Sequence, residues 1–139
     1  MMNDLNKYTA LPGRHRFRAV ALTDNVPLLT AIGNDAEYAD VFVEQLQNFL
    51  QPGDLLIAIS ASGNSRNIVK AVEYAQSSGI KVIGFCGHPG GKLAVLADLA
   101  VIIPSDRIGQ QEDGHMILDH VIAAALRERI AQASPASQA

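Results

Sequence analysis

The chain has 139 residues and a formal net charge of −3, with 48% hydrophobic and 18% charged residues. This length suits one domain with a core of its own, and the composition is that of an ordinary globular protein. The negative charge gives no electrostatic reason to expect nucleic-acid binding. No apolar stretch approaches the roughly 20 residues that span a bilayer, and residues 1–16 contain no signal-peptide core. We therefore expect a cytoplasmic protein without a membrane partner.

The first third of the chain reads as the end of a helix followed by a strand and two further helices. Residues 1–12 have the pattern of a helix that runs into a loop, and residues 17–23 form an apolar run of strand length. Pro27 suits the first turn of the next helix. Asn34 and Asp35 favour the cap of another helix over residues 38–49. Since an α/β domain rarely starts with half a helix, we expect a first strand and helix to precede this chain.

The rest of the chain alternates between strand-like and helix-like segments. Apolar runs predict strands over 55–59, 81–86 and 99–103, and helical spacing predicts helices over 65–77, 92–97 and 110–130. Such alternation indicates a parallel sheet with helices on both faces. We assign residues 1–131 to a single α/β domain and residues 132–139 to a disordered tail.

One short loop carries the clearest chemical signal. The predicted strand 55–59 runs directly into Ser60-Ala61-Ser62-Gly63-Asn64-Ser65, and a helix follows. Backbone N–H groups at a helix N-terminus favour an anion, and serine hydroxyls add donors. The competing interpretation is an ordinary helix cap, but a cap needs only one such residue. We therefore predict a phosphate site, without the lysine of a nucleotide P-loop.

This loop, together with residues 67–71, resembles the sugar isomerase (SIS) domain family, closest to its phosphoheptose isomerase branch. Supporting stretches are Gly33–Asp35, Gly53–Leu56, Gly79–Ile83, Gly90–Lys92, Leu96–Asp98 and Gln111–Glu112. The resemblance implies a three-layer α/β/α, flavodoxin-like fold and a homo-oligomer, a dimer or tetramer. It also implies a phosphorylated sugar as the ligand.

The resemblance implies a set of ligand-binding residues. The phosphate would be held by the loop and the sugar by an Asn-Asp pair, and the family's glutamine at the metal falls on Gln111. In this sequence these residues are Asn34, Asp35, Ser60, Ala61, Ser62, Asn64, Ser65 and Gln111.

The catalytic positions are where this chain departs from the family. Aldose–ketose isomerisation needs a positioned base and acid. The family uses a glutamate, which falls on Asp4, and a histidine, which falls on Asp119. At about 100° per residue, Gln111, His115 and Asp119 share one helix face, whereas His120 does not. A His115–Asp119 pair could act as a base, or His115 could be a structural histidine and Asp119 a surface acid.

No metal ligand is assigned from the sequence, and no cofactor is certain. Zinc is implied by the resemblance only. Cys86, the single cysteine, is expected to be a small buried hydrophobe. His88, in the loop 87–91, is expected to be exposed to solvent rather than to be a ligand.

Three functional hypotheses follow. The first is an isomerase acting on a phosphorylated heptose such as sedoheptulose 7-phosphate. The second is a non-catalytic module that binds sugar phosphates, of the kind that serves regulators or associates with the replication initiator. It is favoured by Asp119 in place of the histidine. The third is an inactive fragment that lacks half of its phosphate site.

Overall fold

The computed structural model describes residues 1–133 and forms two compact units. The sheet unit comprises Leu22–Glu112, and the helical unit comprises Met1–Ala21 together with the chain from Asp113 onward. The last helix, α5 (Ile108–Gln132), begins in the sheet unit and continues into the helical unit. Of the predicted tail, residues 132–139, Gln132 is the last residue of α5, and residues 134–139 lie outside the described residues.

The sheet unit is built on three parallel strands in the order β1-β2-β3. They are β1 (Leu55–Ser60), β2 (Lys81–Gly87) and β3 (Leu99–Ile103). Ser60 pairs with Cys86 across β1 and β2, and Cys86 pairs with Ile102 on β3. The three strands therefore end at one edge of the sheet. The three predicted apolar runs are confirmed as these strands.

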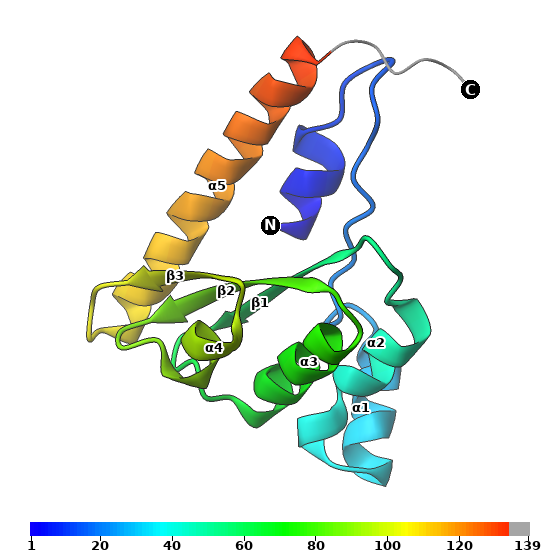
Figure 1. Ribbon diagram of the computed structural model, residues 1–139, viewed down its shortest axis with the longest axis vertical. Coiled ribbons are helices and arrows are strands. Elements are labelled where there is room, and N and C mark those ends of the chain that lie inside the picture. The colour runs from blue at the N-terminus through cyan, green and yellow to red at the C-terminus, as the bar shows by residue number, and fades with distance from the viewer. Residues whose placement is uncertain (134–139) are drawn as a thin grey trace. The chain divides into compact units, whose positions relative to one another are not determined.

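Two helices, α3 (Arg66–Ser77) and α4 (Gly91–Leu96), pack on the same face of this sheet (Figure 1). Their buried side chains join those of β1 and β2 in one core, which comprises Ala58, Val72, Ala75, Ile80, Val82, Cys86 and Leu93. Cys86 is fully buried, as predicted, and burial raises the pKa of its thiol. The α/β fold class predicted from the alternation is confirmed.

The sheet unit begins with α1 (Val26–Asp35), the short 3₁₀ helix η2 (Tyr38–Asp40) and α2 (Val43–Phe49). The Asn25 side chain caps α1 by accepting a hydrogen bond from the Leu28 N–H at 3.1 Å. We predicted that Asn34 and Asp35 cap the following helix, and this prediction is wrong. They are instead the last two residues of α1, where the Asn34 amide donates to the Asp35 carboxylate at 2.8 Å.

The helical unit pairs a short π-helix, η1 (Asp4–Tyr8), with the part of α5 that follows Asp113 (Figure 1). Arg127 of α5 donates to the Tyr8 carbonyl, and its guanidinium lies 5.2 Å from the Tyr8 ring centroid. Arg14 likewise donates to the carbonyls of Ala131 and Ala133. These contacts close the carbonyl ends of both helices. No helix in residues 1–133 has the length and apolarity to cross a membrane.

The prediction of a strand over residues 17–23 is wrong. These residues have no strand partner within the described chain, and Phe17 and Val20 are exposed. The Asn6 side chain occupies the place of a neighbouring strand. Its amide donates to the Ala19 carbonyl at 2.7 Å, and its carbonyl accepts from the Ala19 N–H at 2.9 Å. Both backbone hydrogen-bonding groups of Ala19 are thus satisfied by one side chain.

Two loops at the carboxyl edge of the sheet interlock through glycines. Gly63, with φ of +64°, lies against the backbone of Gly90, so that a Cβ at position 63 would be 1.9 Å from the Gly90 carbonyl oxygen. Gly91 also lies close to the other loop, since a Cβ at this position would be 2.6 Å from the Ser62 carbonyl oxygen. Only residues without a side chain permit this approach of two backbones.

We expect Gly63→Ala to lower the free energy of unfolding far more than Gly79→Ala. Both glycines have positive φ (+64° and +74°), but Gly79 has open space around it. Gly79→Ala should therefore cost about 1 kcal/mol, from backbone strain alone. Gly63→Ala should cost at least twice that, since the loops must also separate. Urea unfolding of the two variants checks this, and equal costs would contradict the interlocked arrangement.

Candidate functional site

The serine loop, Ser60–Ser65, connects β1 to α3 and is folded on its own polar groups. Ser60, the last residue of β1, is buried, and its hydroxyl lies 3.0 Å from that of Ser65. The Ser60 carbonyl accepts from the Gly63 N–H at 2.9 Å, and the Ser62 hydroxyl accepts from the Asn64 N–H at 3.2 Å. The loop is thus a tight turn with serine hydroxyls at both ends.

The N-terminus of α3 has no side-chain cap. Ser65 stands at the N-cap position, but its hydroxyl lies against Ser60 instead of the helix. One first-turn N–H, that of Ile68, is taken by the Asn67 side chain at 2.9 Å. The interpretation of the serines as an ordinary cap therefore fails. The remaining N–H groups of the first turn, with the helix dipole behind them, present a positive end to an anion.

The loop Gly87–Lys92 lies against the serine loop. The Gly87 N–H donates to the Ala61 carbonyl at 2.9 Å, and the Leu93 N–H donates to the Gly63 carbonyl at 2.9 Å. The Lys92 N–H donates to the Asn64 side chain at 3.1 Å. Asn64 is therefore a bridging residue, since its amide also donates to the Ser62 carbonyl at 2.9 Å. Neighbouring strand ends thus hold the serine loop in shape.

A shallow cavity of about 630 Å³ opens beside the end of this loop. It is lined by Glu37, Tyr38, Ala39, Ser65, Arg66 and Asn67. The Arg66 guanidinium lies 3.5 Å from the Glu37 carboxylate. Tyr38 and Glu37 are exposed hydrogen-bonding groups that the sequence reasoning did not single out. The signal was available in principle, because they follow the predicted Asn-Asp pair after a single alanine.

Gln111 belongs to the first turn of α5, and its side chain lies beside Gly87 at the end of β2. Its side chain is buried and donates to the Ser105 carbonyl at 2.6 Å. It also fills the space beside Gly87, where a Cβ would lie 2.0 Å from the amide. Gln111 therefore packs against Gly87, whose N–H donates to the Ala61 carbonyl in the serine loop.

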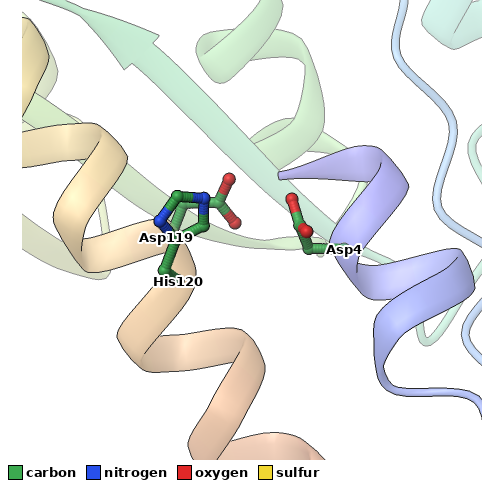
Figure 2. A group of neighbouring side chains, drawn as sticks. All are labelled: Asp4, Asp119 and His120. Atoms are coloured by element: carbon green, nitrogen blue, oxygen red, sulfur yellow. The ribbon is translucent and has the colours of Figure 1, made fainter.

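In the helical unit, the structure brings together Asp4, Asp119 and His120 (Figure 2). One ligand atom from each, two carboxylate oxygens and an imidazole nitrogen, lie within 4.8 Å of one another. Asp119 is 3% exposed, Asp4 is half-buried and His120 is exposed. The two predicted catalytic carboxylates are thus neighbours, and the histidine that joins them is His120.

A cation already lies within this cluster. The Met1 amino group pairs with the Asp119 carboxylate and lies 3.4 Å from that of Asp4. Burial opposes the charge, but the Asp119 and Asp4 carboxylates raise the pKa of this amino group above its ordinary value. The partner of the buried Oδ2 of Asp119 is this amino group. The cluster is therefore a site that favours positive charge.

The donor set fits the zinc implied by the resemblance. Carboxylate oxygens and imidazole nitrogens are ordinary zinc ligands, and the three ligand atoms lie close enough together to share one ion. Sequence reasoning assigned no metal ligand and placed His120 off the functional face. The spacing argument compared residues along α5 alone, so it did not show that Asp4, predicted to be catalytic, reaches His120 from η1.

His115 is buried on the face of α5 that also carries Gln111 and Asp119, as the helical spacing predicted. The predicted use of His115 with Asp119 as a base stays a prediction. His88 is exposed, also as predicted.

Comparison with known proteins places these features in a family. The SIS domain family matches residues 9–87. The chain is 39% identical over 125 residues to the phosphoheptose isomerase of Sulfurimonas denitrificans, covering 86% of this chain and 64% of the relative. It is 42% identical over 112 residues to that of Aneurinibacillus thermoaerophilus, covering 81% and 57%. The chain thus spans less than two thirds of the length of these curated relatives.

Solved structures agree with the sequence relatives. A phosphoheptose isomerase from Francisella tularensis superimposes with a TM-score of 0.82 and 30% identity, over 91% of this chain and 69% of that one. The enzyme from Neisseria gonorrhoeae gives 0.76 and 37%, over 78% and 61%. With the family match across the serine loop, the conclusion is that this chain belongs to the SIS domain family.

Proposed function

We propose that this protein is a sugar-phosphate isomerase that interconverts the aldose and ketose forms of a phosphorylated heptose, with sedoheptulose 7-phosphate as the substrate to test first. The observation that carries the proposal is the uncapped N-terminus of α3 behind the serine loop. The similarity to phosphoheptose isomerases supports the choice of reaction.

In this proposal, the phosphate binds to the serine loop. Ser60, Ser62 and Ser65 supply hydroxyls, and the first turn of α3 supplies backbone N–H groups. A phosphate dianion gains charge-assisted hydrogen bonds there, which are about twice as strong as neutral ones. The neighbouring cavity, with Glu37 and Tyr38, offers acceptors and a donor for sugar hydroxyls.

Proton transfer between adjacent carbons is proposed for Asp4 and Asp119, which the resemblance assigns to catalysis. A carboxylate as base and a protonated group as acid are the minimum for passage through an enediol. Zinc would be held by Asp4, Asp119 and His120. When bound, such an ion would supply Lewis acidity. A homo-oligomer and a cytoplasmic location stay predictions of the resemblance.

The first test is turnover of sedoheptulose 7-phosphate by the wild-type chain and by Ser62→Ala. We expect isomer formation by the wild type. Loss of one hydroxyl bound to a charged phosphate costs about 1.5–3 kcal/mol, so KM should rise roughly 10- to 100-fold. Ser77→Ala is the matched control, because Ser77 lies on the last turn of the same helix and bonds only the Tyr74 carbonyl.

Two outcomes would count against the proposal. A wild-type chain that binds sedoheptulose 7-phosphate without converting it would contradict the isomerase and support a non-catalytic binding module. Equal KM values for Ser62→Ala and Ser77→Ala would contradict the serine loop as the phosphate site.

The second test is uptake of a divalent ion, measured by the visible absorption of Co²⁺ in place of zinc and by equilibrium dialysis with Zn²⁺. We expect one ion per chain, and at least tenfold weaker binding in Asp119→Asn and in His120→Ala, since each removes a ligand. Asp113→Asn is the control, an exposed acid on the same helix. No uptake by the wild type, or equal weakening by the control, would show that the cluster holds no metal.

A further inference from the structure

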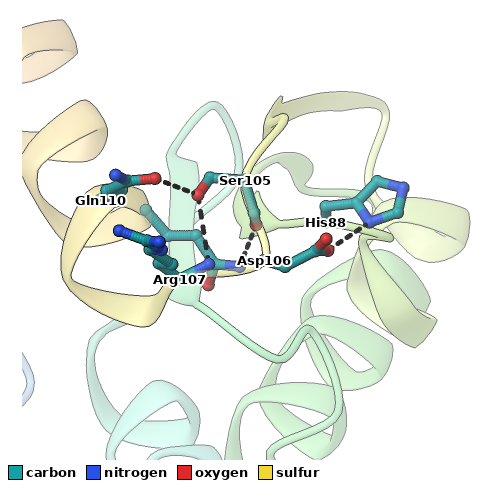
Figure 3. A network of polar contacts seen from close by, with 6 residues as sticks. His88, Ser105, Asp106, Arg107 and Gln110 are labelled. Atoms are coloured by element: carbon teal, nitrogen blue, oxygen red, sulfur yellow. Dashed lines mark hydrogen bonds and ion pairs between the residues drawn. The ribbon is translucent and has the colours of Figure 1, made fainter.

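Outside the serine loop, the carboxyl edge of the sheet carries a histidine–aspartate pair that none of the proposed roles uses. His88 follows β2 and Asp106 follows β3, and the His88 Nδ1 lies 3.2 Å from the Asp106 Oδ1 (Figure 3). The His88 side chain is 57% exposed. A surface pair of this kind adds little stability, so its position is of more interest than its strength.

The backbone fixes where the His88 side chain begins. The residue before it, Gly87, donates its N–H to the Ala61 carbonyl in the serine loop at 2.9 Å. His88 itself donates its N–H to the Ile103 carbonyl at the end of β3 at 3.1 Å. His88 is therefore one residue from a hydrogen bond to the serine loop, held between the ends of β1 and β3.

Asp106 is held by the turn that precedes α5. Ser105 organises this turn, because its N–H donates to the Ile103 carbonyl at 2.9 Å and its hydroxyl donates to the Gln110 side chain at 2.6 Å. The same hydroxyl accepts from the Arg107 N–H at 3.1 Å (Figure 3). The Ser105 carbonyl accepts from Gln111, which packs against Gly87. The turn that carries Asp106 is thus tied back to the end of β2.

We propose that His88, oriented by Asp106, is a second ligand-binding residue at the rim of the serine loop, where its imidazole donates a hydrogen bond to an oxygen of the anionic group. This inference rests on the proposed function, since it adds a contact to the same phosphate site. Asp106 is a positioning residue in this arrangement. It accepts a hydrogen bond from Nδ1, which leaves Nε2 on the opposite side of the ring as a donor to the ligand.

The charged groups around His88 favour an anion on that side. Asp106 is its partner, and Lys92, at the other end of the loop, has no ion-pair partner among residues 1–133. Arg66, in the first turn of α3, is directed to Glu37. Figure 3 shows the Arg107 guanidinium beyond Asp106, away from His88. Besides Arg66, the positive groups that these loops offer to an anion are therefore His88 and Lys92.

Sulfate is the first ligand to test, because it stays a dianion over about pH 5 to 8, the range in which histidines as a class gain a proton. Any change in sulfate affinity over this range therefore comes from the protein and not from the charge of the ligand. The experiment is calorimetric titration of the full chain with sodium sulfate and with sedoheptulose 7-phosphate at pH 6 and pH 8. The proteins are the wild type, His88→Gln and Asp106→Asn. His15→Gln, a substitution of an exposed histidine in the helical unit, is the matched control.

We expect the wild type and His15→Gln to bind sulfate about tenfold more tightly at pH 6 than at pH 8, from one charge-assisted hydrogen bond. In His88→Gln this ratio should fall to about twofold or less, with affinity at pH 8 nearly unchanged. Asp106→Asn should bind less tightly at pH 6, by several-fold, with an unchanged circular dichroism spectrum.

A wild type without pH dependence, or a His88→Gln variant that keeps the full tenfold ratio, would overturn the role of His88. Binding of the sugar phosphate distinguishes failure of the proposed function from failure of the role of His88. If the wild type does not bind sedoheptulose 7-phosphate at either pH, the proposed function fails. If the wild type binds it and His88→Gln binds it equally well at pH 6, only this inference fails.

Discussion

The contact between the backbones of Gly63 and Gly90 is the constraint on which the rest of the sheet unit's chemistry depends. Because Gly63 cannot carry a side chain against Gly90, nor Gly91 against Ser62, two loops that follow neighbouring strands become one connected edge. The Ala61–Gly87 hydrogen bond and the bridging Asn64 side chain complete the connection. The serine hydroxyls and the N-terminus of α3 are consequently held in place before any ligand arrives, which lowers the entropic cost of binding.

Much of the sheet unit could be predicted from the sequence because its signals are local. The run 55–59 is strand-length and apolar, and the serines after it stand directly before a helical pattern, so both β1 and the loop were placed correctly. The segment 17–23 has the same local signal but is not a strand. In that segment the backbone of Ala19 pairs with the side chain of Asn6, which no pattern within the segment could reveal.

The same limit applies to the acidic cluster. Helical spacing correctly placed Gln111, His115 and Asp119 on one buried face of α5. It also set aside His120, because periodicity describes a helix by itself. The π-helix η1 brings Asp4 to within 4.8 Å of both Asp119 and His120, and it is this tertiary contact that selects the histidine. The role of Asp4 and Asp119, which replace the family's glutamate and histidine, therefore has to be inferred from the side chains around them and not from sequence position alone.

The central claim is that the serine loop and the uncapped end of α3 grip the phosphate of a sugar. The most direct measurement is the change in backbone amide chemical shifts when sedoheptulose 7-phosphate is added to ¹⁵N-labelled protein, with sedoheptulose as the ligand that lacks the phosphate. The account predicts that the largest shifts fall on residues 62–67, the loop and the first turn of α3, and only with the phosphorylated sugar. Shifts confined to other residues, or equal shifts with both sugars, would contradict it.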